Sequence, residues 1–326
     1  MKILVLRFSS IGDIVLTTPV VAALKSQLEN IEIHYLTKKS FQSILVNNPN
    51  IDQLITFEKS PKERISELKK EHYDCIIDLH KNTRTLGLKL SLRRKSYSFP
   101  KLNFKKWLLV NFRWQSMPNL HIVDRYFIAV AKLGVVNELK NCEYYLSTED
   151  QVDVQSQLGI EKKHFIAIAI GAQFATKQTT STKWVEILSE IKEPIVIVGG
   201  AMDQEKANEL IRLLPNCTIQ STCGKYSLNQ SASIVEQARL LITNDTGMMH
   251  IASCFNTKIV SIWGSTVPEL GMYPYYPMNK NLFSIHEVKD LSCRPCSKIG
   301  FQKCPKGHFN CMMKQDAKAI KQDLLP

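Results

Sequence analysis

The chain has 326 residues, with 42 Lys or Arg against 30 Asp or Glu, so its formal net charge is +12. Its 44% hydrophobic and 22% charged residues are typical of a globular protein and exclude collagen-like repeats, disulfide-rich miniproteins and disordered chains. The first residues lack the cleavage site of a secretory signal, and no uncharged apolar stretch approaches the roughly 20 residues that span a bilayer. We therefore expect a cytoplasmic protein of two domains.

Short apolar runs alternate with segments of helical periodicity in the first half of the chain. Strands are predicted at residues 2–8, 31–36, 53–57 and 75–80. Between the first two, the apolar residues from Ile14 to Leu28 fit an amphipathic helix, apart from Pro19. Strand, helix and strand in repetition predict a parallel sheet.

A segment without acidic residues follows the fourth predicted strand. From Leu79 to Val123 there is no Asp or Glu, while aromatic residues alternate with basic ones: Lys81, Arg84, Lys89, Arg93, Arg94, Lys95, Lys101, Lys105, Lys106 and Arg113. The segment fits an anionic lipid surface or a phosphorylated amphiphile, and it fits a solvated basic face over core aromatics equally well. Nucleic acid is the weakest alternative because no nucleic-acid-binding motif accompanies the charge.

The second half of the chain repeats the alternation. Strands are predicted at residues 165–170, 195–198, 240–243 and 258–263, with helices at 184–192 and 202–214. The polar stretch 147–157 precedes this series, so we place the domain boundary after residue 158, giving domains of residues 1–158 and 159–326. Ligands of open parallel sheets bind beyond the carboxyl ends of the strands, so the loops after these strands are the candidate sites.

The loop after the first strand is rich in small and polar residues. Ser9, Ser10 and Gly12 allow a ligand to approach the backbone, and Asp13 stands near the start of a helix. A carboxylate there fits a general base, and it also fits a simple helix cap. The G-x-G-x-x-G fingerprint of dinucleotide-binding proteins and the Walker A sequence are both missing, which argues against an NAD-dependent oxidoreductase.

Two loops of the second half carry groups suited to a diphosphate. Asp245, Thr246 and Gly247 end a strand and open a helix that contains His250, so backbone N–H groups and a hydroxyl face the cleft side. Lys177 in the loop after residue 170 supplies a point charge for phosphate. Asp-Thr-Gly also marks aspartic proteases, but those need a second such carboxylate in an all-β protein. Taken singly, Lys177 and His250 also fit a solvated lysine and a buried helix histidine.

These loops together resemble the ADP-heptose:lipopolysaccharide heptosyltransferases of glycosyltransferase family 9. The opening from Met1 to Asp13 is similar to the family's N-terminal signature, and Asn244-Asp245-Thr246-Gly247 with His250 is similar to its donor signature. Gly264-Ser265-Thr266 stands where the family usually has Gly-Pro-Thr, and Thr176-Lys177-Gln178 departs from its usual Thr-Lys-Arg. The likeness covers both halves of the chain and the cysteine-rich tail.

The resemblance implies a GT-B fold, an α/β architecture in which two Rossmann-like domains with doubly wound parallel sheets face a cleft. Residues 1–158 would form the acceptor side and residues 159–326 the donor side. The fold also allows the last helix to pack back against the N-terminal domain. The implied reaction is inverting, metal-independent transfer of heptose from ADP-heptose to the inner core of lipopolysaccharide (Kdo-lipid A or a core heptose), without a cofactor. It would take place at the cytoplasmic face of the inner membrane.

The same resemblance suggests roles for individual residues. Asp13 matches the proposed general base that deprotonates the acceptor hydroxyl. The residues expected at the donor are Lys177, Asp203, Asp245, Thr246, Gly247 and His250. Those expected at the acceptor are Ser9, Ser10 and Gly12, joined by Arg93, Arg94 and Lys95 of the basic segment, which suit an anionic glycolipid. A displaced ADP needs a base on one side and cationic or N–H donors on the other, and no D-x-D sequence is present for a metal.

Four of the nine cysteines lie in the tail. Cys293, Cys296, Cys304 and Cys311 begin as C-x-x-C and fit a structural zinc site, although the second pair lacks the short spacing that makes such sites strong. Reduced thiols packed under a loop are the simpler alternative.

Two other functions remain open from the sequence. One is transfer of a different nucleotide sugar, or to a different acceptor, by a member of the same family. The other is a non-catalytic protein that binds a nucleotide sugar or an anionic glycolipid. Substitution of Asp13 separates them, because a binding protein has no transfer to lose.

Overall fold

The computed structural model describes residues 1–325, which form two compact units. Unit 1 consists of Met1–Lys101 and Leu120–Tyr145, and unit 2 consists of Leu102–Asn119 and residues 146–325. Each unit has a parallel sheet with helices on both faces, and the sequence-predicted alternation of strands and helices is therefore confirmed.

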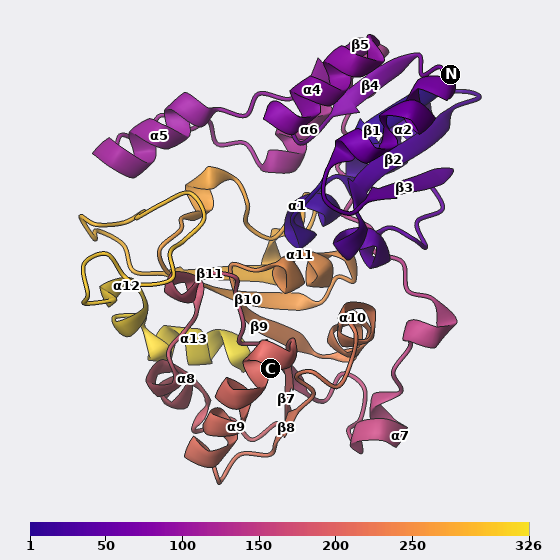
Figure 1. Ribbon diagram of the computed structural model, residues 1–326. Helices are drawn as coiled ribbons and strands as arrows, with labels where there is room; N and C mark the ends of the chain where they lie inside the picture. Colours follow the sequence, from indigo (N-terminus) through magenta and orange to yellow (C-terminus); the bar gives the residue numbers. More distant parts are fainter. Residues whose placement is uncertain (326) are drawn as a thin grey trace. The chain divides into compact units, whose positions relative to one another are not determined.

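Unit 1 contains a five-stranded parallel sheet in the order β3-β2-β1-β4-β5 (Figure 1). Its elements are β1 Lys2–Leu6, α1 Ile11–Val15, α2 Thr18–Gln27, β2 Glu32–Lys38, β3 Gln53–Phe57, α3 Ile65–Lys70, β4 Cys75–Asp78, α4 Thr83–Leu92, β5 Lys95–Ser98 and α6 Ile122–Val130. Leu4, Leu6 and Ile76 face the core under α3 and α4, and α2 and α6 contact the other face. This strand order is that of a doubly wound Rossmann-like sheet.

The predicted helix over residues 14–28 is divided in two at the point that proline dictates. α1 ends at Val15 and α2 begins at Thr18, which puts Pro19 in the first turn of a new helix. The first turn tolerates proline because its N–H groups have no partner within the helix. The break leaves Asp13 in a separate short helix directly after β1.

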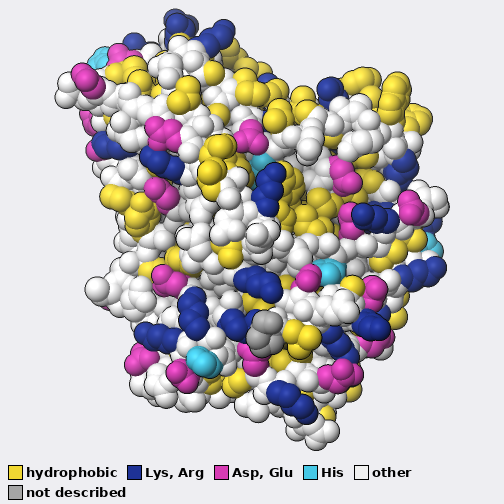
Figure 2. All heavy atoms as spheres, turned by 180° about the vertical axis from the view of Figure 1, so that it is seen from behind, with side chains coloured by type: hydrophobic (Ala, Val, Ile, Leu, Met, Phe, Trp, Pro, Cys, Tyr) yellow, Lys and Arg dark blue, Asp and Glu magenta, His cyan; other side chains and the backbone are white. Residues whose placement is uncertain are grey.

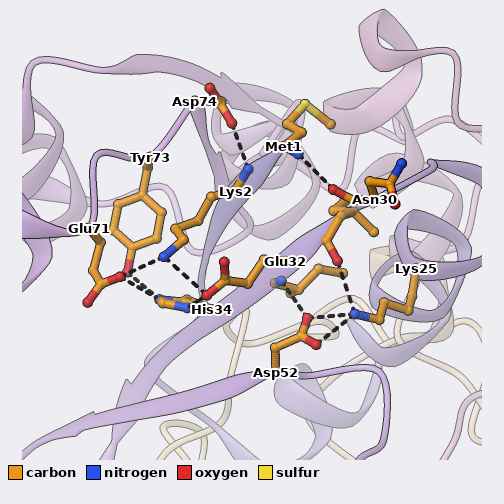
Figure 3. A network of polar contacts seen from close by, with 12 residues as sticks. Met1, Lys2, Lys25, Asn30, Glu32, His34, Asp52, Glu71, Tyr73 and Asp74 are labelled. Atoms are coloured by element: carbon orange, nitrogen blue, oxygen red, sulfur yellow. Dashed lines mark hydrogen bonds and ion pairs between the residues drawn. The ribbon is translucent and has the colours of Figure 1, made fainter.

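Polar contacts hold together the end of this sheet at which its strands begin, called here the amino edge (Figure 3). Lys2 Nζ lies 2.8 Å from Glu71 Oε2 and 3.1 Å from Glu32 Oε1. The backbone N–H of Lys2 donates to Asp74 Oδ2 at 2.6 Å. Asp52 accepts from Lys25 Nζ and from a backbone N–H of β2, each at 2.7 Å. These contacts join the starts of β1, β2 and β3 to the segment before β4.

Unit 2 contains a six-stranded parallel sheet in the order β11-β10-β9-β6-β7-β8. Its elements are α5 Asn103–Phe112, α7 Val154–Leu158, β6 Ile166–Ala169, α8 Ser181–Leu188, β7 Ile195–Val198, α9 Gln204–Leu213, β8 Ile219–Ser221, α10 Leu228–Gln237, β9 Leu240–Asn244, α11 Gly247–Cys254, β10 Lys258–Trp263, β11 Phe283–Glu287, α12 Asn310–Met313 and α13 Ala317–Leu324. Read outward from β6, this is again the Rossmann-like order.

Alternation along β6 builds the two faces of the second core. Ile166 and Ile168 pack under α8, α9 and α13, whereas Ala167 and Ala169 pack under α7, α10 and α11. Because both faces are covered, the strands are continuous apolar runs, and this is why the sequence located them easily.

Three strands were not predicted: β5, β8 and β11. All three are edge strands, and their residues are partly buried or exposed, so their sequences lack the apolar run that identified the central strands. The helix over residues 184–192 is observed as α8 and that over 202–214 as α9, each within a few residues of its predicted ends.

The division of the chain differs from the predicted boundary after residue 158. The second unit begins earlier, at Leu146, because Val152 and Val154 are buried in its core. The last helix, α13, is grouped with this unit, and its Ile320 and Leu324 are buried in the core of the unit. The basic segment is divided, with Leu102–Asn119 grouped with unit 2. Within residues 1–325, every helix is too short or too polar to cross a membrane.

Candidate functional site

Asp13 lies in α1, at the end of the first sheet where the parallel strands finish, called here the carboxyl edge. Its Oδ1 is 2.5 Å from Arg7 Nη2, and its Oδ2 accepts a hydrogen bond from the Ser10 hydroxyl at 2.8 Å and from the Ser10 N–H at 3.3 Å. The side chain is 25% exposed. The carboxylate therefore caps its helix, as one interpretation of the sequence expected, and it is also fixed in position with access to solvent.

Arg7 is the buried partner that holds this carboxylate. Its Nη1 donates to the carbonyl of Leu79 at 2.6 Å and to the hydroxyl of Tyr126 at 3.0 Å, and its Nε donates to the carbonyl of Ser9 at 2.9 Å. Burial by itself lowers the pKa of Arg7, but Asp13, Tyr126 and Tyr35 together outweigh it, and the pKa of Arg7 is raised above its ordinary value. The guanidinium stays charged, and it connects the loop of Asp13 to the end of β4 and to the middle of α6.

His80 and two further cations lie beside this pair. The ring of His80 packs 4.8 Å from the ring of Phe8, and the guanidinium of Arg84 lies 5.6 Å from the same phenyl ring. Lys101 Nζ donates to the carbonyls of His80 and Lys81 at 3.1 and 3.0 Å.

The imidazole of His80 is neutral and incompletely paired. Burial, together with the nearby charges of Arg7, Lys101 and Arg84, lowers the pKa of His80 to about 3. Its Nδ1 is buried without a hydrogen-bond partner among the described residues. A buried ring nitrogen of this kind is an acceptor or donor available to a ligand.

Arg93, Arg94 and Lys95 lie at the opposite edge of the sheet from Asp13. Arg93 ends α4, and Lys95 begins β5 in register with Cys75, the first residue of β4. Arg94 Nη2 is 3.4 Å from His72 Nδ1, at the amino edge. The structure therefore does not bring these three residues together with Asp13, Ser9, Ser10 and Gly12. Their role at the acceptor stays a prediction from the sequence.

Lys177 and Asp245 meet at the carboxyl edge of the second sheet. Lys177 Nζ is 2.6 Å from Asp245 Oδ2, which also accepts a hydrogen bond from the hydroxyl of Thr266 at 2.8 Å. The three residues come from the loops after β6, β9 and β10, so strands far apart in sequence supply one cluster. Lys177 and Asp245 are only 16% and 11% exposed, which places an ion pair in a partly dehydrated setting.

Thr246, Gly247 and His250 surround the start of α11. Thr246 is the residue before the helix, and its hydroxyl lies 3.2 Å from that of Thr243. Gly247 is the first helical residue, so its N–H and those that follow are the unsatisfied donors of a helix start. His250 is buried within α11, where its backbone carbonyl accepts from Ser253 Oγ at 2.7 Å.

Asp203 occupies the loop after β7. Its Oδ2 accepts a hydrogen bond from the N–H of Gly200 at 3.0 Å. A Cβ on Gly171 would collide with the carboxylate of Asp203 unless that side chain moved, so the loops after β6 and β7 touch at this carboxylate. Asp203 thus connects these two loops, and it lies at the same edge of the sheet as Lys177 and Asp245.

The cysteine-rich tail packs against the loop that carries Thr266. Arg294 is 6% exposed; its Nε donates to the carbonyl of Gly264 at 2.6 Å and its Nη2 to the carbonyl of Thr266 at 2.8 Å. Glu287 neutralises it at 2.7 Å. The N–H of Thr176 donates to the carbonyl of Phe301 at 3.0 Å. The tail thereby supports the loops after β6 and β10, which carry Lys177 and Thr266.

The four tail cysteines are free thiols. Cys293 Sγ lies 3.9 Å from His308 Nε2. Burial raises the pKa of Cys311 to about 12, and the neighbouring Cys296, Cys304 and Cys293 add to this. Within residues 1–325 no three or more His, Cys, Asp or Glu side chains are arranged to hold a metal ion. The zinc site stays a prediction.

Sequence reasoning gave no site role to Arg7, His80, Thr266 or Arg294, although Thr266 lies in the Gly264-Ser265-Thr266 motif. Arg7 lies inside the N-terminal signature, so its position was available, but its partners Leu79 and Tyr126 are far away in the sequence. Arg294 likewise has partners that are distant in the sequence, since they precede it by about thirty residues. The sequence signal for such a residue is a charged side chain beside an apolar run. That pattern predicts a buried charge, and a buried charge needs a partner.

Comparison with known proteins gives this arrangement a family. The model of glycosyltransferase family 9 (heptosyltransferase) matches residues 63–302. The chain belongs to glycosyltransferase family 9. The enzyme is therefore a glycosyltransferase, as the resemblance implied.

Similar proteins cover nearly the whole enzyme. Lipopolysaccharide heptosyltransferase 1 of Campylobacter coli is 26% identical over 291 residues, which are 82% of this chain and 84% of that protein. A solved glycosyltransferase family 9 structure from Veillonella parvula has a TM-score of 0.79 and 22% identity, covering 99% of this chain and 96% of its own. An E. coli heptosyltransferase solved with ADP-2-deoxy-2-fluoro heptose has a TM-score of 0.67 and 17% identity, covering 99% of each chain. These structures confirm the GT-B fold of two Rossmann-like domains.

Proposed function

We propose that this glycosyltransferase moves heptose from ADP-heptose to the inner core of lipopolysaccharide, with inversion at the anomeric carbon and without a catalytic metal. Family membership supports the reaction class, and the Campylobacter coli relative supports the substrate class. The observation that carries the mechanism is the Asp13 carboxylate, fixed by Arg7 at 2.5 Å and by Ser10 at 2.8 Å while 25% exposed.

Asp13 acts as the general base in this proposal. Its carboxylate takes the proton of the acceptor hydroxyl, the hydroxyl oxygen forms a bond to the anomeric carbon, and the bond from that carbon to the diphosphate oxygen of ADP breaks. The bonding electrons leave with ADP. Arg7 pairs with Oδ1, and the hydroxyl and the N–H of Ser10 donate to Oδ2, while the side chain is 25% exposed and open to an acceptor hydroxyl.

Lys177 stabilises the leaving diphosphate. In the absence of donor its charge is held by Asp245, which keeps the ammonium in a defined place at the edge of the sheet. Developing negative charge on ADP competes with Asp245 for this ammonium, and the N–H groups at Gly247 and the hydroxyl of Thr246 add donors. Asp203 and His250 complete the proposed donor residues. Lys177 supplies the cation that a metal ion gives in other transferases, and the sequence has no D-x-D motif.

The acceptor is proposed to bind over Ser9, Ser10 and Gly12. Arg84 and the neutral imidazole of His80 are additional groups at this edge that suit a carboxylate or phosphate of an anionic glycolipid. No cofactor is required. The tail cysteines Cys293, Cys296, Cys304 and Cys311 would then have a structural role, either as thiols or around a zinc ion, by holding Arg294. The proposed place of action is the cytoplasmic face of the inner membrane.

The decisive experiment measures ADP release by the purified enzyme given ADP-heptose and heptose-deficient lipopolysaccharide acceptors, with and without a chelator. We expect acceptor-dependent release that persists in chelator. The Asp13→Asn variant should lose release by about 10²–10⁴-fold while it keeps its affinity for ADP. Retained ADP affinity also shows that the variant has folded.

Other outcomes would assign a different function. Release with another nucleotide sugar but not with ADP-heptose would keep the reaction class and replace the donor. ADP-heptose binding without release on any acceptor would favour a binding protein. Release that chelator abolishes would overturn the role given to Lys177.

A further inference from the structure

The segment Leu102–Asn119, called here the aromatic segment, has an unusual surface. It contains α5 and it belongs to unit 2, although it lies between two parts of unit 1 in the sequence. Leu109 and Met117 are buried against Val267 and Leu270. Arg113 Nε donates to the carbonyl of Ser292 at 3.2 Å. The segment is thus attached to its unit by an apolar contact and by the hydrogen bond of Arg113.

The large aromatic side chains of this segment point outward. Phe104 is 70% exposed, Trp107 45%, Phe112 64% and Trp114 65%. Phe104 stacks on Trp107 with centroids 6.1 Å apart, and Trp107 meets Phe112 edge-on at 5.2 Å. Figure 2 shows hydrophobic side chains gathered at its upper right, where α5 lies after the half turn from Figure 1, with Lys and Arg side chains next to them.

Such a cluster is unfavourable in water. Aromatic side chains dominate the apolar area that proteins bury, and contiguous exposed apolar patches mark interaction sites. In this helix the smaller Leu109 is buried while larger aromatics are exposed, so folding of the unit alone does not account for their presence. The cluster therefore requires a partner.

The charge of the segment identifies the kind of partner. It has three basic residues, Lys105, Lys106 and Arg113, and no acidic residue. Trp and Phe beside Lys and Arg on a short helix are the composition of a helix that lies in the interface of a bilayer, with rings at the headgroup level and cations at anionic lipids. A protein partner does not need this one-sided charge.

We propose that the aromatic segment docks the enzyme on anionic lipid bilayers. α5 lies flat on the membrane, with Phe104, Trp107, Phe112 and Trp114 among the headgroups and Lys105 and Lys106 against lipid phosphates. The inference deepens the proposed function, on which it rests for its purpose: a lipid-linked acceptor resides in the same bilayer. The binding itself requires neither donor nor transfer.

The four tryptophans make the test direct. Trp107 and Trp114 are exposed, whereas Trp184 and Trp263 are 0% and 1% exposed in the core of unit 2. Binding to vesicles of phosphatidylglycerol and phosphatidylethanolamine should shift the tryptophan emission to the blue and protect it from acrylamide, because only the surface pair changes its environment. Vesicles of phosphatidylcholine alone should give little shift.

Two variants and a matched control separate the contributions. Phe104→Ser with Trp107→Ser and Phe112→Ser should abolish co-sedimentation with the anionic vesicles. Lys105→Glu with Lys106→Glu should weaken it by about tenfold or more, since each cation near an anionic surface counts separately. Met202→Ser with Met278→Ser removes two side chains that are 97% and 77% exposed elsewhere, and it should leave binding unchanged.

Several results would overturn the proposal. One is binding of the wild type to anionic vesicles that is no stronger than that of the triple aromatic variant. Another is equal binding to phosphatidylcholine vesicles. The last is concentration-dependent self-association that the triple aromatic variant abolishes, together with no binding to vesicles. The last result would assign the surface to a contact between copies of the chain.

Activity separates this proposal from the proposed function. The triple aromatic variant should keep its turnover on a deacylated, soluble acceptor and lose it on the same acceptor embedded in vesicles. Vesicle binding without transfer on any acceptor would refute the proposed function and leave the docking surface intact.

Discussion

The two edges of the first sheet show opposite uses of polar side chains. At the amino edge, Lys2, Lys25 and Asp52 have their charges matched by close partners, and the contacts join neighbouring strands (Figure 3). At the carboxyl edge, one ion pair fixes Asp13, while His80 keeps a buried nitrogen without a described partner. A closed network contributes stability, whereas incomplete pairing leaves groups for a ligand.

The second sheet also has different polar contacts at its two edges. At its amino edge, Lys163 Nζ donates to the carbonyls of Glu236 and Ala238 at 2.6 and 3.1 Å and joins the start of β6 to α10 and β9. At its carboxyl edge, Lys177 and Asp245 form a pair held by Thr266. Parallel strands bring all loops of one kind to one edge, so chemistry accumulates at the carboxyl side.

The largest expected effect distinguishes two aspartates of the first sheet. Asp13→Asn should lower transfer by about 10²–10⁴-fold because the base is lost. Asp52→Asn should leave the rate within twofold and lower the free energy of unfolding by less than about 1 kcal/mol, because its partner Lys25 is accessible to water. Steady-state kinetics and chemical denaturation of both variants measure this. Comparable rate losses would break the contrast between the edges.

A second pair of variants compares a lysine at the carboxyl edge of the second sheet with a lysine at its amino edge. Lys177→Ala should lower kcat/KM for the donor by about 10²-fold, because a preorganised charge at the leaving group is lost. Lys163→Ala should lower the melting temperature while the donor constants stay unchanged. Kinetics with varied donor concentration and thermal melts separate the two. A donor effect from Lys163→Ala would contradict the assignment of the edges.

The third prediction concerns pH. The folded-state pKa of His80 is about 3, below its ordinary value of 6.5, so between these values the unfolded chain binds a proton that the folded chain does not. Stability should therefore fall as the pH drops below about 6.5. Relative to His80→Gln, the wild type should lose about 2 kcal/mol between pH 7 and pH 5. Urea denaturation at both pH values measures this difference, and parallel losses in the two proteins would refute it.

The smallest expected effect tests the basic segment. Arg84→Gln should raise the KM for the acceptor by about tenfold, since one charged contact to an anionic group is lost. The triple neutralisation of Arg93, Arg94 and Lys95, at the amino edge, should change it less. A larger effect from the triple variant would restore the acceptor role that the sequence gave to those residues. The KM for the donor serves as the internal control.

Sequence reasoning worked best where one strand and the loop after it carry the whole signal. Asp13, Lys177 and Asp245 follow buried apolar strands, and the structure places each at a carboxyl edge. It was less useful for Arg93, Arg94 and Lys95, because a run of charge gives no indication of the edge at which it lies. The strands β5, β8 and β11 escaped prediction because half-buried edge strands have weak apolar patterns.

The sequence by itself determined the class of fold, the central strands and the family, because these depend on local periodicity and on short motifs. Tertiary structure alone decided that Arg7 reaches Leu79 and Tyr126, that Arg294 supports Gly264 and Thr266, and that the aromatic segment belongs to unit 2. The physical reason is that a buried charge or an apolar face is satisfied by whatever group the folded chain brings near. That neighbour is set by the packing of the sheets and not by distance along the sequence.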